Sequence, residues 1–166
     1  MNLTGKAWKF PDNISTDHIA PGRLFHLRSN LPEFAKHVLE DADPEFASKM
    51  HKGDFVVAGS NFGLGSSREH APQIIKIAGV GAVIAKSFAR IFYRNAINIG
   101  LLLLEADTDQ IDAGDELEID VRKGIINDVT KNIQITFNPL PEVMIKLQND
   151  GGLIEHIKKH GDFDLV

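Results

Sequence analysis

The densest group of residues that could do chemistry is the run Gly59-Ser60-Asn61-Phe62-Gly63-Leu64-Gly65-Ser66-Ser67-Arg68-Glu69-His70. It follows a short apolar segment and precedes a helical pattern. It therefore occupies a strand-to-helix junction, where backbone N–H groups and the positive end of a helix dipole attract anions. It lacks the Gly-Lys-Ser/Thr of a nucleotide-binding loop, and its glycine spacing differs from the dinucleotide fingerprint. Two hydroxyls, backbone donors and one guanidinium predict a site for a small carboxylic acid.

Ser66 also has a purely structural interpretation. With Glu69 three residues later, it matches a capping box, in which the two side chains only complete the first turn of a helix. Pro72 weakens that interpretation, because proline fits best in the first helical turn. We expect the helix to begin near Glu69 or His70, which leaves both serines in an irregular turn with free hydroxyls.

The elements that must position this run follow an α/β rhythm. Continuous apolar segments at 55–58, 80–85 and 99–104 alternate with helical patterns that end at Ala78 and Ile97. Such runs are typical of parallel strands that are buried on both faces. Other expected elements are a strand at 7–10, a polar loop at 15–23, and helices at 32–41 and 44–50.

The second half of the chain predicts a different pairing. Apolar residues alternate with charged ones at 117–121 and 133–137, which indicates a small antiparallel section. One or two amphipathic helices, broken at Gly151-Gly152, are expected within 141–160, and the basic residues 156–160 are expected to form a solvated helix end. The fold class that we predict is α/β, with a mostly parallel central sheet and one domain over 1–166.

Composition excludes several classes of protein. The 166 residues are 43% hydrophobic and 25% charged, as in soluble globular domains, and the net charge of −5 disfavours nucleic acid as a partner. The longest apolar run is far too short to span a membrane, and no signal peptide is recognisable, so we expect a cytoplasmic protein without membrane contact. The chain has no cysteine, which excludes a disulfide, a thiolate nucleophile and a cysteine-ligated iron–sulfur cluster of its own.

Three motifs carry a resemblance to a known family: Thr16-Asp17-His18-Ile19, the Gly-x-Gly-Ser-Ser-Arg-Glu-His of 63–70, and residues 83–98 followed by Gly100. They resemble the swivelling domain of the aconitase superfamily, and their order is similar to that of the free-standing small subunits of its 3-isopropylmalate dehydratase and homoaconitase branches. The resemblance implies a swivelling β/β/α fold and a hydroxycarboxylate substrate. It also implies a large partner subunit, in a heterodimer or heterotetramer, that holds a [4Fe–4S] cluster through three cysteines.

The resemblance also implies roles for single residues. Ser66 corresponds to the catalytic base, which as an alkoxide removes a proton from the carbon next to a carboxylate. Because a serine hydroxyl is a weak acid, such a base needs concentrated positive potential around it. Ser67 is expected to contact the substrate, and Arg68 to clamp a carboxylate. Asp17 is expected to orient a nearby guanidinium, with capping of a loop as the alternative.

Arg28 falls in the loop that discriminates substrates in this family. In many small subunits Tyr-Leu follows the loop arginine directly, whereas here Leu24-Phe25-His26 precede Leu27-Arg28, as in single-chain aconitases. A buried arginine needs a further substrate carboxylate to pair with, so Arg28 favours citrate-like or homocitrate-like acids. It could instead bind a carboxylate that all substrates of the family share, or lie in solvent.

We therefore expect the small subunit of a hydro-lyase that dehydrates and rehydrates a hydroxycarboxylate. By family frequency 3-isopropylmalate is the expected substrate, and a homoaconitase or aconitase-type subunit is the close alternative. A non-catalytic anion-binding module stays open. RNA binding by Lys86, Arg90 and Arg94 ranks last, because packing or subunit docking explains that face better. We expect no cofactor or metal on this chain, and His18 and His70 are expected to form hydrogen bonds near the site.

Overall fold

The computed structural model describes residues 1–161, in which seven strands form one sheet with the order β4-β3-β2-β1-β5-β6-β7. Their bounds are β1 Asn2–Lys9, β2 Phe55–Val57, β3 Ala82–Ala85, β4 Leu103–Glu105, β5 Glu116–Asp120, β6 Ile125–Asp128 and β7 Ile133–Thr136. Strands β1 to β4 pair in parallel, and β5, β6 and β7 extend the sheet in antiparallel fashion from β1. The predicted parallel sheet with an antiparallel section is confirmed.

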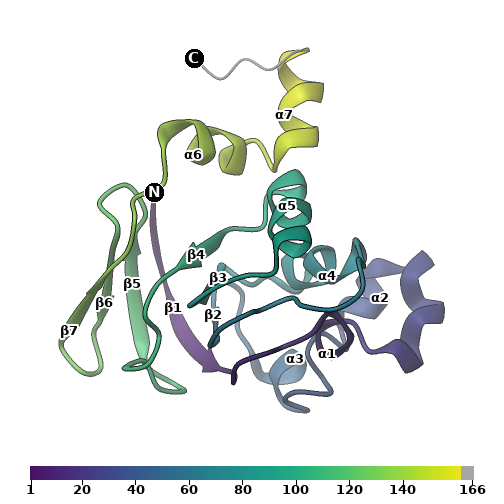
Figure 1. Ribbon diagram of the computed structural model, residues 1–166, viewed down its shortest axis with the longest axis horizontal. Helices are drawn as coiled ribbons and strands as arrows, with labels where there is room; N and C mark the ends of the chain where they lie inside the picture. Colours follow the sequence, from purple (N-terminus) through teal and green to yellow (C-terminus); the bar gives the residue numbers. More distant parts are fainter. Residues whose placement is uncertain (162–166) are drawn as a thin grey trace.

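Seven α-helices accompany the sheet in the described residues: α1 Thr16–Ile19, α2 Leu31–Ala35, α3 Phe46–Lys49, α4 His70–Ala78, α5 Arg90–Ile99, α6 Glu142–Asn149 and α7 Leu153–His160. A 3₁₀ segment, η1, covers Gly22–Ser29. Helices α1 to α5 gather beside the parallel strands, whereas β5 to β7 form the other side of the molecule (Figure 1). Both α4 and α5 end at a glycine in the left-handed conformation, Gly79 and Gly100, which closes a helix without the steric cost of a Cβ atom.

Two apolar cores lie on the two faces of the sheet. Val56 and Val83 face the core that α1 to α5 cover, while Phe55 and Ile84 face a second core shared with β5 and β6. All four side chains are fully buried, and each contributes about 1.5–3 kcal/mol of transfer free energy. Burial on both faces explains why these strand sequences are continuously apolar.

Several local expectations are wrong. The segment at 15–23 is not only a loop, because it contains α1 and the start of η1. Ser15 caps α1: its Oγ accepts the His18 backbone N–H at 3.1 Å, and His18 Nδ1 accepts the Ser15 N–H at 2.9 Å. The helix expected at 32–41 stops at Ala35, and the chain then turns through Leu39 at a φ of 56°.

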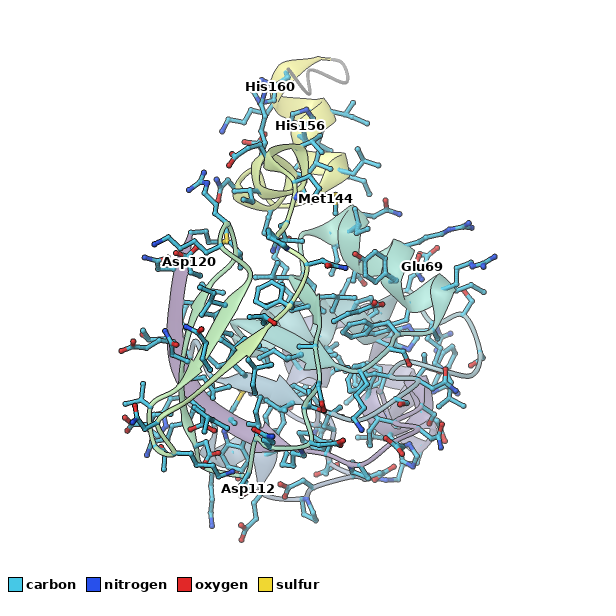
Figure 2. The ribbon with its side chains drawn as sticks, turned by 60° about the vertical axis from the view of Figure 1, so that its left-hand side comes forward. Glu69, Asp112, Asp120, Met144, His156 and His160 are labelled. Atoms are coloured by element: carbon cyan, nitrogen blue, oxygen red, sulfur yellow. The ribbon has the colours of Figure 1, made fainter. Side chains whose placement is uncertain are left out.

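The C-terminal helices separate at Gly151-Gly152 as predicted, but their end is not entirely solvated. His156 is fully buried. His156 and His160 lie at the opposite end of the molecule from Asp112 (Figure 2). Within residues 1–161, no helix combines the length and the hydropathy that crossing a bilayer requires.

Candidate functional site

Three loops that leave adjacent parallel strands run side by side at one edge of the sheet. They are residues 10–15 after β1, 58–69 after β2 and 86–89 after β3. The middle loop is hydrogen-bonded to both neighbours: Gly63 N donates to Ile14 O at 2.7 Å, and Phe62 N donates to Ser87 O at 3.0 Å. The serine-rich run therefore lies between the starts of α1 and α5, at the carboxyl ends of the strands, where open α/β sheets bind ligands.

A cavity of about 210 Å³ opens at this place. Its walls are Thr16, Gly63, Gly65, Ser66, Ser67, Arg68, Ala89, Arg90, Ile91, Phe92 and Asn95. Pockets for drug-sized ligands hold about 300–1,000 Å³, so this one suits a smaller molecule. Its polar groups are hydroxyls, an amide and guanidiniums, which match a small carboxylic acid.

Gly63 allows the serine-rich loop to approach α5. Its φ is 86°, in the left-handed region, and a Cβ atom placed on it would lie 2.3 Å from the Phe92 ring. Real Cβ contacts are never that short, so only glycine fits here. The serines that follow therefore lie across the cavity from the first turn of α5.

Arg68 links its own loop to the segment that contains helix α1. Its Nε donates to Ser66 Oγ at 3.2 Å and its Nη1 to Ala20 O at 2.9 Å, while Nη1 also lies 3.0 Å from Asp17 Oδ1. The same Asp17 oxygen accepts the Gly22 N–H at 3.0 Å. The structure thus brings Asp17, Ser66 and Arg68 together, with the carboxylate placed to orient the guanidinium and also bonded to its own loop.

Ser66 does not cap a helix. Helix α4 begins at His70 after Glu69, which makes no side-chain capping bond, so the capping-box interpretation is wrong and the predicted start of the helix is confirmed. The Ser66 carbonyl accepts the Thr16 hydroxyl at 3.0 Å, which fixes the backbone. The exposed side chain is left at the cavity with a cationic donor on its oxygen. Such a donor stabilises an oxyanion more than a neutral hydroxyl.

The first turn of α5 forms the opposite wall of the cavity, which sequence reasoning missed. Its N-cap residue, Ala89, has no side-chain acceptor, so the N–H groups of the first turn keep their positive potential toward the cavity. Arg90 and Asn95 line the same wall. The sequence did contain a signal for this wall: β2 and β3 are neighbouring parallel strands, and each is followed by a helix, so both helices begin at the same edge of the sheet. Lys86, which the sequence groups with Arg90, does not line this wall, because its ammonium pairs with Asp109.

Arg28 lies outside the cavity wall. It is exposed on η1, donates from Nη1 to Phe25 O at 3.1 Å and stacks 4.4 Å above the centre of the Phe25 ring. The Arg68 guanidinium lies 5.8 Å from the centre of that ring, so Phe25 connects the two arginines. The structure therefore places Arg28 beside the site rather than in it.

His70 packs between aromatic rings behind the site. Its ring stacks on Phe34 at 5.4 Å between centroids and meets Phe25 edge-on at 5.6 Å. Burial lowers the pKa of His70, and the positive charges of Arg68 and Arg28 lower it further. Its Nε2 is buried without a hydrogen-bond partner. His18 forms the expected hydrogen bonds, whereas the buried nitrogen of His70 does not.

The fold and the cavity define an α/β domain with a small cavity, lined by hydroxyl and guanidinium groups, where its parallel strands end. Residues 13–109 match the family model of the aconitase C-terminal domain, and the chain belongs to that family. This confirms the resemblance that the motifs indicated.

Close relatives extend the match over nearly the whole chain. The chain is 66% identical to "3-isopropylmalate dehydratase small subunit 2" of Archaeoglobus fulgidus, over 99% of this chain and 100% of that protein. It is 58% identical to "3-isopropylmalate dehydratase small subunit 1" of Thermotoga maritima, over 99% of both. A crystal structure of 3-isopropylmalate dehydratase from Methanocaldococcus jannaschii superposes with a TM-score of 0.90 at 46% identity, covering 97% of this chain and 96% of that one.

Proposed function

We propose that this chain is the small subunit of a 3-isopropylmalate dehydratase, a hydro-lyase that removes water from a hydroxycarboxylate and adds it back. The observation that carries the proposal is the Ser66 hydroxyl, which lies at an open cavity with Arg68 Nε 3.2 Å from its oxygen. The names of full-length relatives at 55–66% identity support the same reaction.

In this proposal Ser66 is the base. Its Oγ takes a proton from the carbon next to a substrate carboxylate, and it returns a proton when water adds back. Two sources of positive potential favour the alkoxide that this requires: the Arg68 guanidinium and the first turn of α5. Asp17 holds Arg68 in place through Nη1, and we assign Nη2 to a substrate carboxylate. Ser67 offers a second hydroxyl from the cavity wall.

The aconitase family implies an iron–sulfur cluster, and this chain does not fit one. It contains no cysteine, and its cavity offers no thiolate ligand. We therefore propose that a large partner subunit carries a [4Fe–4S] cluster and completes the active site in a heterodimer or heterotetramer. The proposal includes a cytoplasmic location and a single domain over 1–166. A single cooperative unfolding transition of the chain would test the latter.

Replacing Ser66 by alanine tests the catalytic assignment. In enzyme reconstituted with the large subunit, Ser66→Ala should abolish detectable turnover of 3-isopropylmalate. It should leave the melting temperature unchanged, because the hydroxyl is exposed and caps nothing. Ser48→Ala is the matched control, since the exposed hydroxyl of Ser48, on α3, donates to Glu45 O and lies outside the cavity.

The same variant separates the enzyme from a non-catalytic module. If Ser66 only capped a helix, its replacement by alanine would lower the free energy of unfolding by about 1 kcal/mol and would preserve carboxylate binding. Full turnover by Ser66→Ala enzyme would overturn the proposal.

The substrate is tested by comparing isopropylmalate with citrate and homocitrate. We propose that Arg28 discriminates between them from its position beside Phe25. Arg28→Val should lower the turnover of the two tricarboxylates relative to isopropylmalate by about tenfold or more, because a charge-assisted contact is lost. An unchanged ratio would exclude this role for Arg28. A wild-type preference for citrate or homocitrate would identify an aconitase-type or homoaconitase subunit instead.

A further inference from the structure

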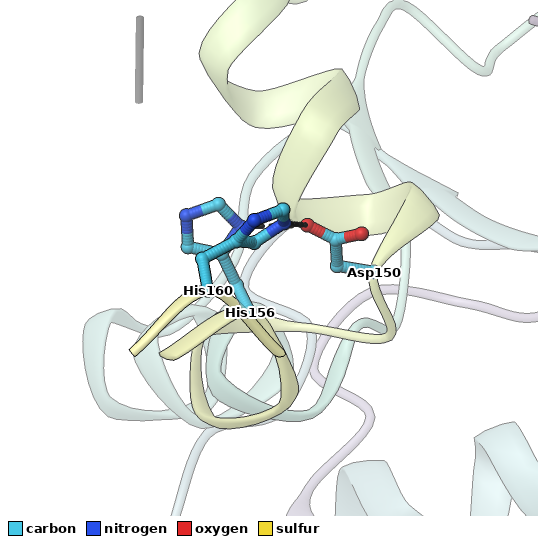
Figure 3. Close-up of side chains that lie close together, drawn as sticks. All are labelled: Asp150, His156 and His160. Carbon is cyan, nitrogen blue, oxygen red and sulfur yellow. Dashed lines mark hydrogen bonds and ion pairs between the residues drawn. The ribbon is translucent and has the colours of Figure 1, made fainter. Parts of the chain in front are cut away.

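The turn between α6 and α7 brings together three side chains of metal-binding type, away from the cavity. Asp150 follows the last residue of α6, and His156 and His160 lie one helical turn apart on α7. Both imidazole rings lie beside the Asp150 carboxylate (Figure 3). The ligand atoms that the three residues offer all lie within 4.8 Å of one another.

One carboxylate oxygen serves both imidazoles. Asp150 Oδ2 lies 2.6 Å from His156 Nδ1 and 3.0 Å from His160 Nε2. The other oxygen, Oδ1, accepts the ammonium of Lys159 at 3.0 Å. The ammonium therefore orients the carboxylate and leaves Oδ2 to the histidines, as outer hydrogen-bond partners do around metal ligands.

Burial makes this cluster unusual for a helix end. His156 is fully buried, and the Asp150 and His160 side chains are 8% and 28% exposed. The second nitrogen of His156, Nε2, is buried without a hydrogen-bond partner, so Nδ1 makes the ring's polar contact. Hydrogen bonds from His156, Lys159 and His160 hold the pKa of Asp150 far below its usual value, so the carboxylate is ionised at neutral pH. The cluster thus combines an anionic carboxylate with a buried imidazole, and solvent reaches it on the side of His160.

We propose that Asp150, His156 and His160 form a binding site for a divalent transition-metal ion, with zinc as the best-matched ion. Histidines at i and i+4 on one helix face, with a carboxylate, are a typical zinc ligand set, and a fourth position remains for water. This departs from the expectation that the chain binds no metal.

The present geometry is close to what zinc requires. Tetrahedral zinc with ligands at about 2.0–2.1 Å places the ligand atoms about 3.3 Å apart. The 2.6 Å pair must open by about 0.7 Å, and the two nitrogens, at most 4.8 Å apart, must approach by no more than about 1.5 Å. A small rotation of the partly exposed His160 side chain supplies the second movement. The ion then replaces the hydrogen-bond protons between the imidazoles and Oδ2.

The consequence would be structural rather than catalytic. A bound ion would tie the α6–α7 turn to the last turn of α7. The start of α7 is packed against the end of α5, where a Cβ atom on Gly152 would lie 2.4 Å from Gly100 N. The site would therefore clamp the C-terminal helix to the body of the protein. It depends on none of the cavity residues, so it stands or falls separately from the proposed function.

The test uses the full chain without an affinity tag, stripped of metal with a chelator and titrated with zinc alone. We expect one zinc ion per chain and a melting temperature raised by roughly 5–10 °C at a hundredfold excess over Kd. His160→Ala should weaken zinc binding at least about tenfold, because one of three ligands is lost. His51→Ala is the matched control and should bind zinc as the wild type does, since that imidazole is 86% exposed and lies 4.0 Å from a lone carboxylate.

Three results would overturn the proposal. The first is the absence of stoichiometric binding at about 100 μM zinc. The second is an equal zinc affinity of the wild type and His160→Ala, and the third is a loss of zinc binding in His51→Ala alone. The cluster would then be a hydrogen-bonded link only. If His160→Ala proves unfolded without metal, Asp150→Asn takes its place, because it keeps both imidazoles and the size of the side chain. The visible spectrum of cobalt bound in place of zinc needs no variant: intense tetrahedral bands are expected, and the weak bands of octahedral cobalt would contradict the proposed geometry.

Discussion

Replacing Arg68 by lysine tests whether a guanidinium activates Ser66. The arginine reaches three acceptors at 2.9–3.2 Å, which are Ala20 O, Asp17 Oδ1 and Ser66 Oγ. A lysine ammonium is one compact donor on a flexible stem and cannot span all three. It keeps the positive charge and is expected to stay with Asp17 and Ala20, so the serine loses its donor. Removing one donor to a developing oxyanion costs about 2.7–4 kcal/mol.

We therefore expect Arg68→Lys to lower kcat by about 10²–10³-fold in the reconstituted enzyme. Folding should change little, with a melting temperature lower by roughly 2–4 °C for a loss of about 1 kcal/mol. Arg23→Lys is the matched control, since its guanidinium also bridges acidic partners, Glu40 and Asp41, but lies outside the cavity wall. If Arg68→Lys enzyme kept more than about a third of the wild-type kcat, less than 1 kcal/mol would be at stake and Arg68 would not be what activates Ser66.

Two further predictions concern stability. Gly63→Ala should lower the melting temperature by roughly 3–10 °C, because a left-handed φ and a 2.3 Å contact with Phe92 together cost about 1–3 kcal/mol. Gly114→Ala has a similar φ but open space around it, so an equal loss there would refute the contact argument. His70 has a folded pKa below its unfolded value, so its contribution to stability is complete above about pH 6.5 and is lost as the pH falls. Thermal melts from pH 7 to 5 should therefore fall more steeply for wild type than for His70→Phe, and parallel curves would contradict this.

Most of the parallel sheet could be predicted because each signal is local. Continuous apolar runs mark β2 and β3, and Gly79 and Gly100 stop the helices that follow. The start of α4 followed from Pro72 alone. Strand β6 was missed, because its Asp128 is typical of a turn. Asp128 is nevertheless fully buried, and its pKa is raised by burial and by the hydrogen bond that its protonated carboxyl donates to the Asp115 carboxylate.

The candidate site could be predicted only where one segment contains the chemistry. Ser66 and Arg68 lie within a single motif, whereas the wall formed by Arg90 and Asn95 depends on two loops lying side by side in space. The burial of His156 could not be predicted for the same reason, because it depends on a residue outside its own helix. Its basic neighbours indicate a solvated helix end, and only Asp150 across the turn shows why the ring is buried.

Because Ser66 is exposed, its hydroxyl would need a partner subunit to become an effective base. A full negative charge on Oγ, 3.2 Å from Arg68 Nε, would gain about 1 kcal/mol from that cation in bulk water and about 5 kcal/mol at an effective dielectric constant of 20. The difference of about 4 kcal/mol corresponds to roughly a thousandfold in rate. In the free chain the cavity is open to water, and Ile91 on its rim is 51% exposed. A subunit that covered this rim would exclude the water, so the same serine, arginine and helix end would become a stronger base without any change in their geometry.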